Sequence, residues 1–198
     1  MPFQISRWVT LTLLMVSASS WADTTPGSSI ANQGIPQKGI APCMSCHGRD
    51  GAGMAPTAYP RIAGMNAGYI ARQLKNFRTG ARSNPVMMPM AKNLSDKDIE
   101  AVSAYYAAMP IPAPAAQPPS GDANKIANHL AQWGDWSGRT LPACAQCHAA
   151  DGNGIGAIFP GITAQHAGYI KAQLLAWKTG GEIKRPIGPD EEHRRSTD

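Results

Sequence analysis

Hydrophobic residues in this chain recur mostly at helical spacing, and no run alternates convincingly between apolar and polar positions as a half-buried strand would. One predicted helix covers residues 67–79 and ends at Gly80, because glycine favours the left-handed conformation of a helix cap. Its apolar face is formed by Ile70, Leu74 and Phe77. This spacing places the three residues on one side of the helix, which predicts that this side packs against a core.

A second predicted helix covers residues 96–109. Ser95 is a favourable N-cap, and the acidic side chains at positions 96 and 98 suit the positive end of the helix dipole. Pro110 ends the helix, because proline cannot continue the backbone hydrogen bonding. The apolar stripe of this helix is formed by Ile99, Val102 and Tyr106. We therefore expect an all-α fold.

The chain contains an internal duplication. CMSCHGRDGAGMAPTAYPRIAGMNAGYIARQLKNFRTG at 43–80 matches CAQCHAADGNGIGAIFPGITAQHAGYIKAQLLAWKTG at 144–180, with one residue deleted in the second copy before its proline. The proline-rich stretch between the copies favours an extended, stiff connector. The sequence thus predicts two tandem domains, at 28–111 and 122–198, joined by a linker at 112–121.

The first 22 residues have the layout of a secretory signal peptide. Arg7 precedes an apolar run at 8–16, and small residues at Ser20 and Ala22 suit a cleavage site. The apolar run is shorter than the ~20 residues that a membrane-spanning helix needs. We expect cleavage after Ala22 and export to the periplasm.

The formal net charge of the 198-residue chain is +5, and its Lys and Arg residues are scattered rather than grouped in blocks. This distribution does not favour a nucleic acid as partner. An exported protein with four cysteines would ordinarily form disulfides. The position of the cysteines indicates a different use.

All four cysteines lie in two CxxCH motifs, and each motif is the attachment pattern of a c-type haem. Two thiols three residues apart can each add to one haem vinyl group, and the next residue's imidazole then reaches the iron as proximal ligand. The residues are Cys43, Cys46 and His47 in the first motif, and Cys144, Cys147 and His148 in the second. A thioredoxin-like pair would need α/β surroundings, and a four-cysteine zinc site would leave both histidines unexplained. Two haem c groups per chain are expected.

The sixth iron ligand separates electron carriers from haem enzymes and gas-binding proteins, and methionine is the ligand of the carriers. In the first copy the candidates are Met87, Met88 and Met90, in a predicted loop between the two helices. The other methionines of this copy, Met54, Met65 and Met109, are expected to be packing or surface residues.

The segments CMSCHGRDG, YPRIAG, YIARQLKNFRTG and MMPMAKNLSDKDIEAVSAYY resemble a dihaem class I cytochrome c of the cytochrome c₄ type. The resemblance covers about residues 35–110 and 122–180 and implies two tandem cytochrome c domains. It implies Met87, seven residues before Leu94, as the ligand, with Met88 as the alternative. It also implies that the carbonyls of Pro60 and Pro160 accept a hydrogen bond from the haem-ligating histidines.

The resemblance further implies electron transfer rather than catalysis, with peripheral membrane association compatible with it. The donors in that family are quinol-oxidising complexes or periplasmic dehydrogenases, and the acceptors are terminal oxidases. Two alternatives remain open. The protein could be the haem subunit of a dehydrogenase complex, or a dihaem peroxidase or gas-binding protein that uses an open second haem.

The second copy departs from the first beyond residue 180. The sequence has no methionine after Met109 and no counterpart of the helix at 96–109, so the second domain is expected to lack its last helix and its methionine ligand. One hypothesis is that the polar tail at 181–198 is a frameshifted end. The other is that the tail is natural, with His193 or His166 as iron ligand. An exposed distal face at the second haem follows from the chain as written.

Overall fold

The computed structural model describes residues 25–113 and 121–180. The predicted signal peptide, most of the linker and the tail lie outside these described residues. The described residues form α-helices, two short 3₁₀ helices and isolated β-bridges, and they include no β-strand. The elements are α1 (Pro26–Gln33), η1 (Pro36–Lys38), α2 (Met44–His47), η2 (Ala55–Thr57), α3 (Ala67–Thr79), α4 (Met87–Lys92), α5 (Asp96–Ala108), α6 (Asp122–Gln132), α7 (Cys144–His148) and α8 (Ala167–Thr179). The all-α prediction is confirmed.

Helix α3 spans the residues that the sequence predicts, and its ends show why. The Asn66 side chain accepts a hydrogen bond from the Tyr69 N–H at 3.2 Å, which caps the N-terminus. Gly80 ends the helix in the left-handed conformation, with φ of 78°. The helix buries Ile70 and Phe77 on the face that its spacing predicts.

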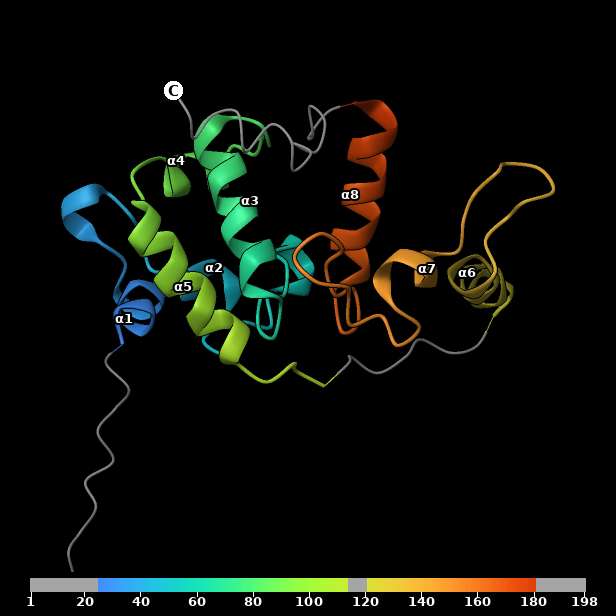
Figure 1. Ribbon diagram of the computed structural model, residues 1–198, viewed down its shortest axis with the longest axis horizontal. Helices are drawn as coiled ribbons and strands as arrows, with labels where there is room; N and C mark the ends of the chain where they lie inside the picture. Colours follow the sequence, from blue (N-terminus) through green and yellow to red (C-terminus); the bar gives the residue numbers. More distant parts are fainter. Residues whose placement is uncertain (1–24, 114–120, 181–198) are drawn as a thin grey trace, which may run out of the picture.

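Helix α5 begins at a capping box and ends one residue before the predicted end. The Ser95 hydroxyl accepts a hydrogen bond from the Asp98 N–H at 3.2 Å, and the Asp98 carboxylate accepts one from the Ser95 N–H at 2.9 Å. The helix packs against α1 and α3, and Figure 1 shows it beside both. The core of the first domain lies between these three helices, around Ile99 and Tyr106.

The contact between α1 and α5 depends on a glycine. A Cβ added to Gly27 would lie 2.2 Å from the Ala101 carbonyl oxygen, so no other residue fits at this approach without a shift. Helix α1 begins at Pro26, two residues before the expected start of the domain, because Thr25 caps it through the Ser28 N–H.

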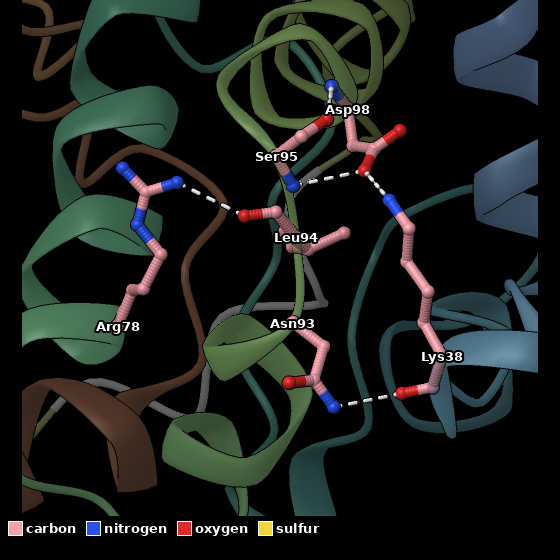
Figure 2. A network of polar contacts seen from close by, with 6 residues as sticks. All are labelled: Lys38, Arg78, Asn93, Leu94, Ser95 and Asp98. Atoms are coloured by element: carbon pink, nitrogen blue, oxygen red, sulfur yellow. Dashed lines mark hydrogen bonds and ion pairs between the residues drawn. The ribbon is translucent and has the colours of Figure 1, made fainter.

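Polar side chains fasten the start of α5 to two neighbouring elements (Figure 2). On one side, Lys38 Nζ lies 2.5 Å from the Asp98 carboxylate, and Asn93 donates to the Lys38 carbonyl at 2.8 Å. On the other side, Arg78 of α3 donates to the Leu94 carbonyl at 2.9 Å and also pairs with the carboxylate at position 96. These contacts fix where α5 crosses α3.

The methionines predicted to lie in a loop are in fact helical. Met87, Met88 and Met90 belong to the short helix α4. Pro89 is the third residue of this helix, where the missing N–H costs no intrahelical hydrogen bond because the first four N–H groups have no partner in the helix. The Asn84 side chain accepts a hydrogen bond from the Met87 N–H at 2.9 Å and supports the N-terminus.

The second domain repeats the elements of the first as far as residue 180. Helices α6, α7 and α8 follow the order of α1, α2 and α3, and α8 lies 100 residues after α3. The one-residue deletion lies in the loop between the two residues of a β-bridge. In the first domain the bridge joins Met54 to Tyr59, and in the second it joins Ile155 to Phe159, which is one residue closer along the chain. The predicted lack of a last helix concerns residues beyond the described part of the chain. In the described part, no helix is long and apolar enough to cross a membrane.

Candidate functional site: two cofactor sites and the contact between them

The first CxxCH motif forms a short helix that presents its histidine inward. Cys43 is the N-cap of α2 and His47 is the last residue of that helix. The His47 ring is buried, and its Nδ1 donates to the Pro60 carbonyl at 2.9 Å. This hydrogen bond sets the tautomer and leaves Nε2 available as an iron ligand.

Burial favours the uncharged forms of the groups in this site. It lowers the pKa of His47, and the hydrogen bond to the Pro60 carbonyl opposes this effect. It also raises the pKa of the Cys43 thiol to about 11. Neutral imidazole is the form that binds a metal, so the site presents its histidine in the required state.

The second motif has the same arrangement in a more open setting. His148 ends α7, and its Nδ1 donates to the Pro160 carbonyl at 2.7 Å. The Phe159 ring meets the imidazole edge-on, with 6.2 Å between the ring centroids. Ala149 has φ of 66°, a left-handed value that Gly48 adopts without strain after His47.

The predicted methionine ligands lie in α4. The Met88 sulfur accepts a hydrogen bond from the Ser83 hydroxyl, with 3.8 Å between oxygen and sulfur. Met65 is buried in the core and Met54 is exposed at the surface, as the sequence predicts for residues without a ligand role. The choice of Met87 over Met88 stays a prediction.

The residues present fit a covalently bound haem. All four cysteines are free thiols, and the two of each motif are three residues apart, with Cys43 as the N-cap of α2 and Cys144 as the first residue of α7. Arg61, next to Pro60, is 1% exposed, and its Nε has no hydrogen-bond partner among the described residues. A buried cationic donor of this kind needs an anionic acceptor, and haem carries two propionate carboxylates.

Three arginines that the sequence prediction missed donate hydrogen bonds across the domain boundary, and one of them, Arg72, donates to the Ile158 carbonyl at 2.8 Å. Arg61 Nη2 donates to the Gly161 carbonyl at 3.2 Å, and Gln165 makes two hydrogen bonds with the Arg61 backbone, at 2.9 and 3.0 Å. Arg82 donates to Tyr169 at 3.1 Å and to Gln173 at 2.6 Å. In the repeat, Gly161 stands where the first copy has Arg61, and a Cβ at Gly161 would lie 2.8 Å from the Asn153 carbonyl oxygen and 3.5 Å from Arg61 Nη2.

Comparison with known proteins identifies relatives that are named as c-type cytochromes or as electron acceptors. The sequence pattern of the family described as Cytochrome c matches residues 38–109. The thiosulfate dehydrogenase electron acceptor of Stutzerimonas stutzeri (strain A1501) is 40% identical over 195 residues, which cover 93% of this chain and 90% of that protein.

Two solved structures are similar over most of the chain. Thiosulfate dehydrogenase (TsdBA) from Marichromatium purpuratum matches with a TM-score of 0.74 and 43% identity over 81% of this chain, which spans only 34% of that longer chain. Reduced cytochrome c₄ from Pseudomonas stutzeri matches with a TM-score of 0.64 and 31% identity, covering 76% of this chain and 82% of the other.

The helical fold and the two CxxCH sites define a dihaem c-type electron carrier, with two covalently attached haem c groups. The chain belongs to the cytochrome c family and is a cytochrome c₄-like member of it.

Proposed function

We propose that this protein accepts electrons from a thiosulfate-oxidising dehydrogenase and delivers them to a further redox partner, ultimately a terminal oxidase. The observation that carries the proposal is the 40% identity, over 90% of its length, to a relative named as a thiosulfate dehydrogenase electron acceptor. The 43% identity to part of the solved TsdBA chain supports the same donor.

In this proposal the chain holds each haem by two thioethers and one histidine. When bound, haem supplies an iron that changes reversibly between the ferric and ferrous states. The carbonyls of Pro60 and Pro160 orient the two imidazoles through hydrogen bonds of 2.9 and 2.7 Å, which supports equivalent proximal sides. The residues are Cys43, Cys46 and His47 for the first haem, and Cys144, Cys147 and His148 for the second.

The two sites differ on the distal side. We assign Met87 to the first iron, because the Met88 sulfur is engaged by Ser83. Methionine remains bound in both redox states and raises the reduction potential. The sequence offers the second iron no methionine after Met109, so we assign it an open or water-occupied sixth position.

The contact between the domains gives the chain a route from one site to the other. Arg61 follows Pro60, whose carbonyl accepts the hydrogen bond from His47. The Arg61 guanidinium donates to the carbonyl of Gly161, which follows Pro160, the acceptor for His148. The residues that follow the two histidine-supporting prolines therefore meet at the domain boundary. The layout at 1–22 supports the periplasm as the compartment.

Reduction by a purified dehydrogenase tests the proposal. The oxidised holoprotein is mixed with thiosulfate and a catalytic amount of thiosulfate dehydrogenase, and the haem absorption bands are followed by stopped flow. We expect reduction that depends on both additions and saturates with carrier concentration. Rapid reduction by a quinol-oxidising complex, with no reduction by the dehydrogenase, would contradict the assigned donor but leave the carrier function intact.

A further inference from the structure

An apolar stripe on α8 is open to solvent in the second domain. It is a shallow groove lined by Ala167, Ile170, Lys171, Leu174, Leu175 and Lys178, which we call the α8 groove. Leu174 is 57% exposed and Leu175 is 50% exposed. Neighbouring leucines on one helix face seldom stay exposed in a folded chain unless they form a binding site for another surface.

The first domain shows what covers the equivalent stripe. Ile70 and Leu74 of α3 lie 100 residues before Ile170 and Leu174 of α8. Ile70 belongs to the buried core that also holds Ile99 and Tyr106 of α5, and Leu74 is partly buried against that core. Ile70 is only 8% exposed. In Figure 1, α5 crosses the first domain beside α3, whereas no labelled helix of the described chain crosses α8.

The charges around the groove match those of a helix such as α5. In the first domain, Arg78 pairs with Asp96 in the first turn of α5 at 2.6 Å. Arg78 also donates to the preceding Leu94 carbonyl, as Figure 2 shows. Lys178 occupies the position of Arg78 in α8, and Lys171 adds a second positive charge at the groove. The groove thus combines apolar residues with a basic rim, which complements an acidic first turn.

We propose that the α8 groove binds an amphipathic helix of a partner protein, with an acidic first turn and an apolar stripe spaced like Ile99, Val102 and Tyr106. A second copy of this chain is a poor donor, because its own α5 is buried, with Ile99 0% and Tyr106 2% exposed. The chain's own residues 181–198 contain Pro186 and Pro189 and no apolar stripe with the spacing of Ile99, Val102 and Tyr106.

The partner helix is expected to rest mainly on α8 rather than on α6. Gly34 and Gly134 follow the first helices of the two domains and have matching backbone surroundings, so they are equivalent positions. Counting back seven residues from each aligns Gly27 with Ala127. Gly27 is the residue that lets α5 approach α1 closely, and the Cβ of Ala127 removes that freedom in the second domain. The predicted contact is therefore centred on Leu174 and Lys178.

A synthetic peptide with the sequence of residues 94–109 provides the test. The fluorescently labelled peptide is titrated against the full-length holoprotein, and its anisotropy is measured. We expect saturable binding with one peptide per chain, together with slower hydrogen exchange at residues 167–179. In a matched control peptide, serine replaces Ile99, Val102 and Tyr106, and at least a tenfold weaker affinity is expected.

Protein variants locate the binding site. Leu174→Asp should abolish binding, whereas Leu130→Asp on α6 should change the affinity less than threefold. Lys178→Glu should weaken binding, and a peptide with lysine at positions 96 and 98 should restore it. Absence of saturable binding, or equal binding by Leu174→Asp, would overturn the proposal. Slow exchange at 167–179 that the peptide does not change would also overturn it, since the chain's own residues would then cover the groove.

Discussion

Arg82 of the first domain donates a hydrogen bond of 2.6 Å to Gln173 of the second domain. The same guanidinium donates to Gln73 at 3.0 Å, and Gln73 is the repeat counterpart of Gln173. Arg82 thus connects equivalent glutamines of the two domains, and it is only 6% exposed. This contact is positioned to set the distance and orientation between the two haem domains.

Removing the guanidinium should loosen the domain contact. In Arg82→Ala, we expect a larger radius of gyration by small-angle scattering and slower electron exchange between the haems, because buried hydrogen bonds to a charged group are lost. Arg49→Ala is the matched control, since Arg49 is exposed. Unchanged scattering and exchange rates in Arg82→Ala would show that the domains are held by other contacts.

Asp98 should make the first domain more stable at neutral than at acid pH. Burial alone would raise the pKa of Asp98, but hydrogen bonds from Lys38 and Ser95 lower it below the ordinary value. The stabilisation is therefore complete above about pH 3.9, the ordinary aspartate pKa, and is lost as the pH falls through the lowered value. Denaturant unfolding of Asp98→Asn should differ from the parent at pH 7 and converge with it in acid.

The Met87 sulfur should be the sixth ligand of the first haem. Met87→Leu should remove the sulfur-to-iron charge-transfer absorption and lower the reduction potential of that haem, because the thioether favours ferrous iron. Met88→Leu should leave both properties unchanged. The reverse result would assign the ligand to Met88.

The second haem should bind external ligands that the first excludes. Carbon monoxide added to the reduced protein should bind to one of the two haems, since the sequence supplies no methionine after Met109. Resonance Raman spectra should show one low-spin and one high-spin ferrous haem. Two low-spin, methionine-ligated spectra would refute this assignment.

The backbone next to the second histidine should be strained. Ala149 has a φ of 66°, where an L-residue other than glycine pays a steric penalty. Ala149→Gly should stabilise the second domain by about 1 kcal/mol, measured by denaturant unfolding of the holoprotein. Gly48→Ala at the matching position, with φ of 78°, should destabilise the first domain.

The sequence was sufficient to predict helices α3 and α5 of the first domain and the histidine-to-proline hydrogen bonds at both haem sites. Periodicity and capping residues act locally, so α3 and α5 fall within one residue of the predicted ranges. The hydrogen bonds from His47 and His148 to the two prolines follow the family resemblance. These features depend on short spacings that a single chain displays directly.

Two features could not be predicted in the same way. Helix α4 was not predicted: it has only six residues and holds Pro89 at its third position, where proline is tolerated. The roles of Arg61 and Arg82 depend on how two folded domains meet, which no local pattern encodes. The two copies differ at both positions, with Gly161 opposite Arg61 and Glu182 opposite Arg82, but they differ at many other positions as well.

The mass of the intact exported protein tests the central claim most directly. The protein is expressed in a host that matures c-type cytochromes, and peptides spanning Cys43 to His47 and Cys144 to His148 are analysed after proteolysis. The account predicts two added haems per chain, one on each peptide. Unmodified thiols or cystines at either pair of cysteines would contradict it.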